Sequence, residues 1–265
     1  MPKVRQPVAS KPDPPTRAGP GRPRRRDTAA AAADDGALGR QSILKAALAL
    51  IDDKGLADFN IRDLAAALEV SPAAIYWHVP NRSALVSGAI ALALDGVADS
   101  MAKGTWQVRL RSLLHGFRET LRRHPALAPA VANELACNAA FDGALPDQVL
   151  AALGDAGFTG DALVDAFNVV IAALCGFATL ELSSAPAGDA KAWEAACRAQ
   201  IDAVDRQRHP HLGRHLARLR NRAFLLRWSS GKEAPLDSGF DAWVDVVLRG
   251  LQARARALRR AGGGA

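Results

Sequence analysis

Two short helices separated by only two residues are the feature that most constrains the fold of this chain. In the segment 60–82, Asn60 is placed to cap a first helix, and Ser71 is placed to cap a second one. The second helix begins with Pro72, whose missing N–H costs nothing at the first helical position. Only Glu69–Val70 lies between the two helices. Because so short a connection forces them to cross steeply, the segment predicts a helix-turn-helix.

The remainder of the sequence repeats apolar residues at helical spacing, and no stretch alternates as a strand would. The sequence therefore predicts an all-α protein. The expected helices cover residues 43–54, 61–68, 72–78, 82–102, 106–123, 126–138, 146–156, 161–182, 190–208, 212–228 and 240–260.

The positive charge of the chain is concentrated at its start. Residues 1–26 hold eight bases and a single acid, which accounts for the whole net charge of +7, together with seven of the fifteen prolines. A segment so poor in apolar residues cannot form a core, so residues 1–37 are predicted to be a disordered basic arm. Such an arm can follow phosphates or enter a narrow minor groove, or it can simply be solvated. The bases placed to contact nucleic acid are Arg22, Arg24, Arg25 and Arg26.

Composition excludes several classes of protein. With 49% apolar and 23% charged residues, the chain has the balance of a folded soluble protein. The longest apolar run, residues 166–180, is short and is interrupted by Asn168, so we expect no membrane span. No secretory signal is recognisable, and three cysteines at no metal-ligand spacing suit a reducing compartment. We therefore expect a cytoplasmic protein.

The exposed face of the second short helix carries the residue types that DNA recognition needs. Ala73 and Ala74 are small enough to let the helix approach base edges, while Tyr76 and His78 can donate hydrogen bonds to phosphates. The alternative is that Tyr76 and Trp77 are core aromatics and His78 a surface residue. Three consecutive aromatic side chains with polar tips cannot all be buried, which favours the DNA-contacting interpretation.

These residues carry a family resemblance. The run 40–85 contains Ile-Leu-x-Ala-Ala-Leu from Ile43 onwards and Ile-Tyr-Trp-His-Val-x-Asn-Arg-x-Ala-Leu from Ile75 onwards, and it resembles the tetracycline repressor (TetR) family, within it the tetracycline repressor subgroup. The similarity continues to about His124. It implies a three-helix DNA-binding head over residues 38–85, a linker helix over residues 82 to about 102, and a helical effector-binding and dimerisation body over residues 86–260.

The resemblance also implies residue roles. Arg62 and the start of the second short helix would read bases, and Tyr76, His78 and Arg82 would hold phosphates. The expected DNA-binding residues of the head are therefore Arg62, Ser71, Pro72, Ala73, Ala74, Tyr76, Trp77, His78 and Arg82.

The sequence departs from the family pattern at several positions. Glu69 occupies a turn position usually held by glycine, which costs about 1–2 kcal/mol if the residue is left-handed. Ile61 stands where tetracycline repressors offer a hydroxyl group to a phosphate. Leu113 replaces the asparagine that grips the drug, and Val131 and Ala98 fall near the positions of metal- and drug-binding histidines. Recognition of tetracycline with magnesium is therefore not expected.

We accordingly expect a homodimeric repressor that binds a palindromic operator in double-stranded DNA and is released by a small apolar or aromatic effector, uncharged or weakly polar. The residues expected to line the effector pocket are Trp106, Leu113, Phe117, Val131 and Phe177. One alternative is a helical small-molecule-binding or enzyme module whose head is an interaction domain. Another is a nucleoid-type protein that binds DNA non-specifically through its arm alone.

Nothing in the sequence calls for catalysis, a cofactor or a metal. His211 and His215 have a spacing that could bind a metal, but further ligands are missing, so solvent-facing histidines are expected. Cys175 lies in an apolar run and is expected to be a small core residue. No phosphate-cradling glycine loop and no catalytic pair of carboxylates is recognisable.

Two late segments are expected to form the dimer as a four-helix bundle, because their apolar residues recur at a spacing close to 3.5. Packing of the same residues inside one monomer is the alternative. The two seams are Leu163, Phe167, Val170, Leu174 and Phe177, and Phe240, Val244, Val247, Leu251 and Leu258.

Overall fold

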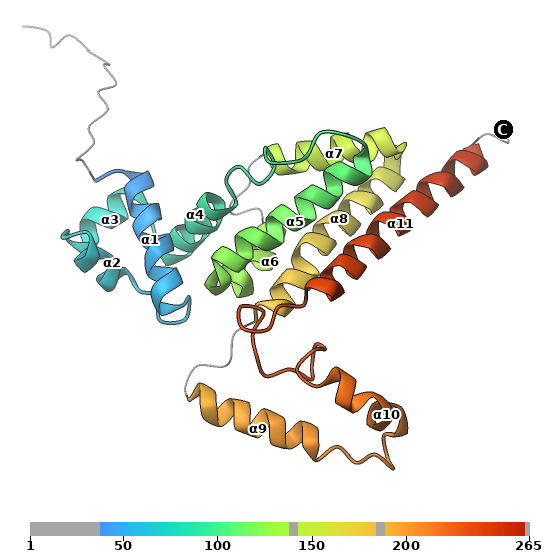
Figure 1. The fold of residues 1–265 in the computed structure, drawn as a ribbon. Coiled ribbons are helices and arrows are strands. Elements are labelled where there is room, and N and C mark those ends of the chain that lie inside the picture. Colours follow the sequence, from blue (N-terminus) through green and yellow to red (C-terminus); the bar gives the residue numbers. More distant parts are fainter. Residues whose placement is uncertain (1–37, 138–142, 184–188, 263–265) are drawn as a thin grey trace, which may run out of the picture. The chain divides into compact units, whose positions relative to one another are not determined.

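The structure, a computed structural model, describes residues 38–137, 143–183 and 189–262. The predicted basic arm, including Arg22, Arg24, Arg25 and Arg26, lies outside the described residues. In the described part the protein contains helices and no strand, so the all-α prediction is confirmed (Figure 1). The helices are α1 (Arg40–Lys54), α2 (Ile61–Ala67), α3 (Pro72–His78), α4 (Arg82–Leu94), α5 (Trp106–Arg123), the 3-10 helix η1 (Pro125–Leu127), α6 (Ala128–Cys137), α7 (Ala144–Ala156), α8 (Gly160–Glu181), α9 (Ala190–Asp202), α10 (Pro210–Leu219) and α11 (Asp237–Gly262).

Side-chain caps set the starts of three short helices. The Asn60 side chain accepts a hydrogen bond from the backbone of the third residue of α2 at 2.9 Å, and Ser71 does the same for α3 at 3.3 Å. Asn81 caps α4 in the same way at 2.8 Å. Each cap satisfies one of the backbone N–H groups that a helix start leaves without a partner. The capped helices expected from the sequence therefore form.

The turn between α2 and α3 is held by a pair of backbone hydrogen bonds. Val70 N donates to Ala65 O at 3.0 Å, and Glu69 N donates to Ala66 O at 3.2 Å, which is the Schellman arrangement at a helix C-terminus. This arrangement places Glu69 at φ +55°. Glu69 is therefore a non-glycine residue in the left-handed region, the case in which the sequence predicts a cost.

The head packs on itself and on α4. Ile43, Ile51, Leu64 and Ile75 are completely buried and lie in one continuous apolar core with α4. α1 packs mainly against α4 and also contacts η1. The head, α1 to α3, therefore shares one hydrophobic core with the helices that follow it.

α4 is shorter than the sequence predicts. The expected helix over residues 82–102 ends at Leu94, and residues 95–100 form turns. Gly96 adopts φ +75°, a conformation that ends a right-handed helix and that glycine adopts without strain. The apolar residues beyond this point, Val97 and Ala98, are still buried, which is why their spacing resembled a continuing helix.

α5 and α8 form the centre of the body. α8 contacts α5, α6, α7 and α11, and α5 in addition contacts α7 and α11 (Figure 1). One face of α5 is buried along its whole length, through Leu110, Leu113, Phe117 and Leu121.

The two predicted dimer seams lie largely inside the monomer. Val170 and Leu174 of α8 are buried, and so are Phe240 and Val244 of α11. The two helices pack against each other and against α5, which accounts for these seams without a second chain. The alternative of packing within one monomer is therefore correct for these residues.

α8 is long and apolar enough to cross a membrane by length and composition. It reaches this length because the helix extends beyond the apolar run 166–180 to 22 residues. A single such helix is weak evidence, since core helices have the same properties. Here α8 packs against four other helices of the body.

Two expected helices end early because polar side chains stabilise turns. The helix expected over 190–208 ends at Asp202, and Asp205 then accepts hydrogen bonds from the backbone of Gln207 and Arg208 at 2.8 and 3.1 Å. The helix expected over 212–228 occupies Pro210–Leu219, after which Asn221 adopts φ +54°. Its side chain accepts hydrogen bonds from the backbone of residues 228 and 229.

Candidate DNA-binding surface and effector cavity

The outer face of α3 presents large aromatic side chains to solvent. Trp77 is 88% exposed and Tyr76 is 47% exposed, whereas Ile75 between the head helices is fully buried. The alternative that Tyr76 and Trp77 are core aromatics is thereby excluded. The remaining predicted DNA-binding residues of this surface are also exposed except Ala74, which is half-buried: Arg62, Ser71, Pro72, Ala73, His78 and Arg82.

Arg82 makes contacts within the protein. Its guanidinium group donates hydrogen bonds to the backbone oxygens of Phe59 at 3.1 Å and Leu56 at 2.6 Å. It also lies 5.7 Å from the centre of the Phe59 ring. Arg82 therefore fixes the loop between α1 and α2 to the start of α4, a role that sequence reasoning missed. A contact of Arg82 with a DNA phosphate stays a prediction.

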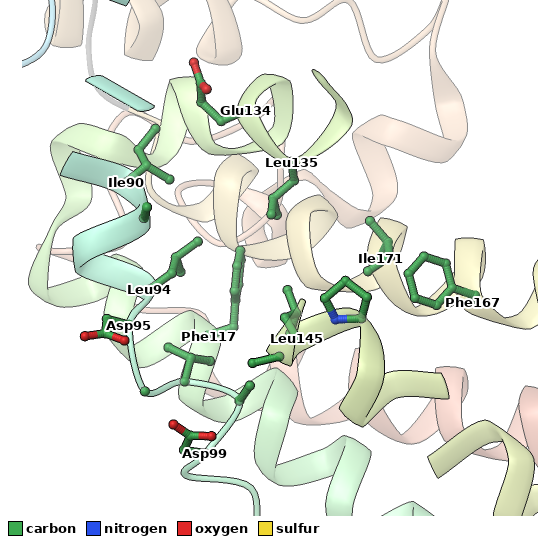
Figure 2. A pocket seen from close by; sticks show the side chains of 16 residues that line it. Ile90, Leu94, Asp95, Asp99, Phe117, Glu134, Leu135, Leu145, Phe167 and Ile171 are labelled. Atoms are coloured by element: carbon green, nitrogen blue, oxygen red, sulfur yellow. The ribbon is translucent and has the colours of Figure 1, made fainter. Parts of the chain in front are cut away.

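A cavity of about 160 Å³ lies in the body between the end of α4, the loop after it, α5, α6, α7 and α8 (Figure 2). Most of its wall is apolar. The apolar side chains that line it include Ile90, Leu94, Val97, Phe117, Leu135, Leu145, Phe167 and Ile171. A cavity with such a wall can take a small apolar or aromatic molecule.

Only one of the five predicted pocket residues lines this cavity. Phe117 is part of the wall, while Leu113 and Val131 are completely buried elsewhere in the core. Trp106 is half-buried at the start of α5 and is not part of the wall, and Phe177 lines a different groove. The periodicity of α5 identified its buried face correctly, but it did not distinguish a cavity wall from solid core.

Sequence reasoning missed three acidic side chains in the wall, namely Asp95, Asp99 and Glu134. Glu134 is 7% exposed and accepts a hydrogen bond of 2.6 Å from Ser87 Oγ. This bond joins α6 to the buried face of α4. The available signal was the acidic break Asp95–Gly96, which ends α4 and brings the following loop to the cavity.

A buried ionic cluster fastens the other end of α8. Arg118 of α5 donates two hydrogen bonds to the Glu181 carboxylate at 2.7 and 2.6 Å and a third to Asp237 at 2.9 Å. Glu181 is completely buried and also accepts from the backbone of Leu236 at 2.7 Å. Burial by itself would lower the pKa of Arg118, but the bonds to Glu181 and Asp237 raise it above its usual value. The cluster ties α5, α8 and the start of α11 together.

Two family models match the chain. Residues 43–89 match the model described as "Bacterial regulatory proteins, tetR family", and residues 100–254 match "Tetracyclin repressor-like, C-terminal domain". The chain belongs to the TetR family. The resemblance read from the sequence is therefore confirmed, and the second match extends it to the body, which contains the cavity.

Curated relatives cover only part of this TetR-family chain. The tetracycline repressor protein class D of Escherichia coli is 34% identical over 93 residues, which is 33% of this chain and 41% of that repressor. The chain therefore matches less than half the length of this relative.

Solved structures of TetR-family proteins extend the likeness to most of the chain. A possible TetR family transcriptional regulator from Streptomyces coelicolor A3(2) is 25% identical with a TM-score of 0.63, and the match covers 81% of this chain and 98% of that one. Apo ActR from Streptomyces coelicolor is 18% identical with a TM-score of 0.62, covering 83% and 98% of the two chains. The latter likeness concerns the fold alone.

A second hollow in this TetR-family body is an apolar groove between α8 and α11. It has a volume of about 330 Å³ and is lined by Val169, Ala172, Ala173, Gly176, Phe177, Leu180, Phe224, Trp243 and Val247. Val169 and Leu180, together with Val246 on α11, are large apolar side chains that are exposed. Val169 and Leu180 belong to the exposed face of α8, and Val246 belongs to the exposed face of α11.

The structure also bears on two other features of the sequence, the histidines His211 and His215 as possible metal ligands and the thiol of Cys175. Within the described residues no group of three or more histidine, cysteine or acidic side chains could hold a metal, and this includes the surroundings of His211 and His215 on α10. Cys175 is a free, half-buried thiol, and burial raises its pKa to about 11. A thiol with so high a pKa stays protonated at neutral pH and is a poor nucleophile.

Proposed function

We propose that this TetR-family protein is a cytoplasmic transcriptional repressor that binds a palindromic operator as a homodimer and is released by a small apolar or aromatic effector. The proposed domains are the basic arm 1–37, the head 38–85 and the body 86–260. The observation that carries the proposal is the exposed face of α3. On this helix, which Ser71 caps, the side chains of Tyr76 and Trp77 are exposed to solvent. Exposed large aromatic side chains of this kind mark a binding surface.

The chemistry of α3 suits a major groove. The small residues at its start allow close approach to base edges, and the Tyr76 hydroxyl and His78 ring can donate to phosphates. Arg62, exposed on α2, can reach a guanine edge with two hydrogen bonds.

A second copy of the chain would supply the second head. The groove between α8 and α11 and its exposed apolar neighbours Val169, Leu180 and Val246 support a dimer interface on this side of the body. Two heads can bind one palindrome only when their recognition helices are about 34–36 Å apart, one turn of DNA. An effector acts by favouring a different arrangement of the heads.

The function needs neither a catalytic step nor a cofactor or metal. The effector cavity has an apolar wall with Phe117 at its centre (Figure 2). Binding of the effector would be transmitted to the head through α4. The end of α4 lines the cavity, and the same helix packs against α1 of the head.

The test is selection of bound sequences from random double-stranded DNA by the full chain, followed by titration of the selected site. We expect a palindrome, bound by a dimer. Arg62→Ala should weaken binding and relax the preference at one base pair by about 1–3 kcal/mol, whereas Tyr76→Ala should weaken binding to all sequences alike. Arg214→Ala, which removes an exposed base from α10, is the control. Full operator affinity in both head variants would refute the proposal.

A further inference from the structure

The loop that joins α10 to α11 presents a leucine side chain to solvent (Figure 1). Leu225 is 97% exposed, more than any other large apolar side chain in the described part of the chain. Its backbone adopts φ +69°, a left-handed conformation that is unfavourable for a bulky residue. Two costs therefore fall on one residue, an exposed apolar surface and a strained backbone. Such strain persists only where the surrounding structure enforces it, and it is common at binding sites.

Hydrogen bonds hold this loop in one conformation. Asn221 N donates to Leu226 O at 2.8 Å, and Leu226 N donates to Ala223 O at 3.1 Å. The Asn221 side chain accepts a hydrogen bond from the backbone of Trp228 at 3.1 Å. Because these bonds close the loop on both sides of Leu225, the backbone that carries the exposed side chain is fixed before any partner binds. A contact residue that is already in place loses little conformational entropy on binding.

The residue before Leu225 belongs to the wall of the apolar groove between α8 and α11. Phe224 packs edge-on against Phe177 of α8, with ring centres 5.0 Å apart, and both rings line the groove. The segment before α11 is tied to the end of α8, because Gly231 N donates to Glu181 O at 2.7 Å. Since consecutive Cα atoms are only about 3.8 Å apart, Leu225 lies beside the groove of its own chain.

The groove has room for an aliphatic side chain. Its volume is about 330 Å³, and three small residues of α8, Ala172, Ala173 and Gly176, contribute to its lining. A Cβ atom at Gly176 would meet no atom within 4 Å, so the space above this residue is open. Val169 and Leu180, which also line the groove, are exposed. An apolar side chain that entered here would remove apolar surface from water on both partners, which is favourable.

We propose that Leu225 of one protomer inserts into the groove between α8 and α11 of a second copy of this chain, and that the second copy does the same in return. A two-fold interface brings the same patch of both chains together, so a side chain can meet a groove that lies beside it on its own chain. A second copy supplies both missing elements at once, a groove for Leu225 and a side chain for the groove. This inference rests on the homodimer of the proposed function and identifies the contact that stabilises it.

The test measures the dissociation of the dimer of the full chain by analytical ultracentrifugation, without DNA or ligand. Leu225→Asn removes the apolar side chain and introduces a residue that tolerates the left-handed conformation. Gly176→Leu fills the groove at a position where the monomer has open space. Each variant should raise the dissociation constant at least about 100-fold, because two leucine side chains in every dimer lose their buried position.

Three further variants serve as controls. Leu225→Met retains an apolar side chain of similar size and should keep most of the dimer affinity. Leu150→Asn removes an exposed leucine from α7, and Gly154→Leu adds a side chain on α7 at a glycine with equally open surroundings. Neither substitution on α7 should change the dissociation constant.

A mixture of the two interface variants tests whether the contact is reciprocal. When a Leu225→Asn chain pairs with a Gly176→Leu chain, the intact leucine of the second chain meets the intact groove of the first, and one of the two contacts is restored. Each variant homodimer has none. Mixed dimers should therefore exceed the fraction expected from random pairing, as counted by native mass spectrometry with one variant mass-labelled. Variants that only destabilised the fold would show no such preference.

The outcomes are distinct from those of the DNA experiment. Variant dimers as stable as the wild type, mixed dimers at the random fraction, or a monomeric wild-type chain would overturn the assignment of this contact. In the first case the groove is left to another occupant, such as a small apolar molecule. A dimer that selects a palindrome but is unaffected by both variants overturns only the contact. Conversely, preferred mixed dimers of a chain that selects no palindrome would overturn the proposed function and retain the interface.

Discussion

His124 Nδ1, at the end of α5, lies 2.7 Å from a carboxylate oxygen of Asp52 in the last turn of α1. The contact joins the head to the body at a point away from α4. Close to it, η1 packs against α1, and Leu127 of η1 is completely buried. The head is therefore attached to the body at two places, so a movement of α4 has to be accommodated at the contact between Asp52 and His124.

This pair should be measurable by a double-mutant cycle. Asp52→Ala, His124→Ala and the double variant are compared by urea denaturation at neutral pH. Because both side chains are only partly buried, we expect a coupling free energy of about 0.5–1 kcal/mol. Strictly additive effects of the two single substitutions would show that the contact contributes nothing to the attachment of the head.

The buried cluster at the end of α8 should dominate the stability of the body. Glu181→Ala leaves Arg118 buried without its main partner and the Leu236 N–H without an acceptor. We expect the free energy of unfolding to fall by about 3–5 kcal/mol, the usual cost of breaking a buried ion pair. Thermal or chemical denaturation provides the measurement.

The matched control is the exposed pair of Asp165 and Arg254, separated by 3.4 Å. Asp165→Ala should cost at most about 1 kcal/mol, because water screens this pair. If the two substitutions destabilised the protein equally, the buried cluster would have no special role in fastening α5, α8 and α11.

Glycine at the helix-turn-helix turn should stabilise the head. Glu69→Gly removes the side chain from a residue held at φ +55°, and we expect the free energy of unfolding to rise by about 0.5–1 kcal/mol. Glu69→Ala retains the Cβ atom and should bring no such gain, which separates backbone strain from the loss of a charge. A glycine variant no more stable than the alanine variant would contradict the interpretation.

The basic arm should contribute to DNA affinity but not to the core sequence preference. Removal of residues 1–26 eliminates eight bases and one acid. The slope of log affinity against log salt concentration should become shallower by about 0.9 for each DNA phosphate that the arm neutralises in the full chain. Measurement of operator binding over a range of salt concentrations tests this, and an unchanged slope would identify the arm as a solvated tail.

Features fixed by local chemistry could be predicted from the sequence. The caps Asn60 and Ser71, and Pro72 at the first position of α3, locate the helix-turn-helix, so its position follows from the sequence. The left-handed conformation of Glu69 is seen only in the structure. The end of α4 was missed because Val97 and Ala98 continue the buried apolar pattern beyond a break that depends on the backbone conformation of Gly96.

Features fixed by distant packing could not be predicted in the same way. A 3.5-residue apolar spacing on α8 does not reveal whether its partner is another helix of the same chain or of a second chain, and Val170 and Leu174 turned out to pack internally. The cavity is formed where the side chains of α4, the loop after it, α5, α6, α7 and α8 leave a gap in the core. A local sequence pattern does not contain this information. Glu134 in particular looks like an ordinary helix residue until its burial against Ser87 is known.

The residues that end α4 also line the cavity: Asp95, Gly96 and Val97 contribute to its wall. In evolutionary terms, the turn cannot change its ligand contacts without also changing the length and the direction of the helix that packs against α1 of the head. Substitutions that alter ligand preference at this turn would alter the response as well. New ligand specificities should therefore arise more readily by substitutions on α7 and α8, at Leu145, Phe167 or Ile171, which lie in the wall but outside this helix.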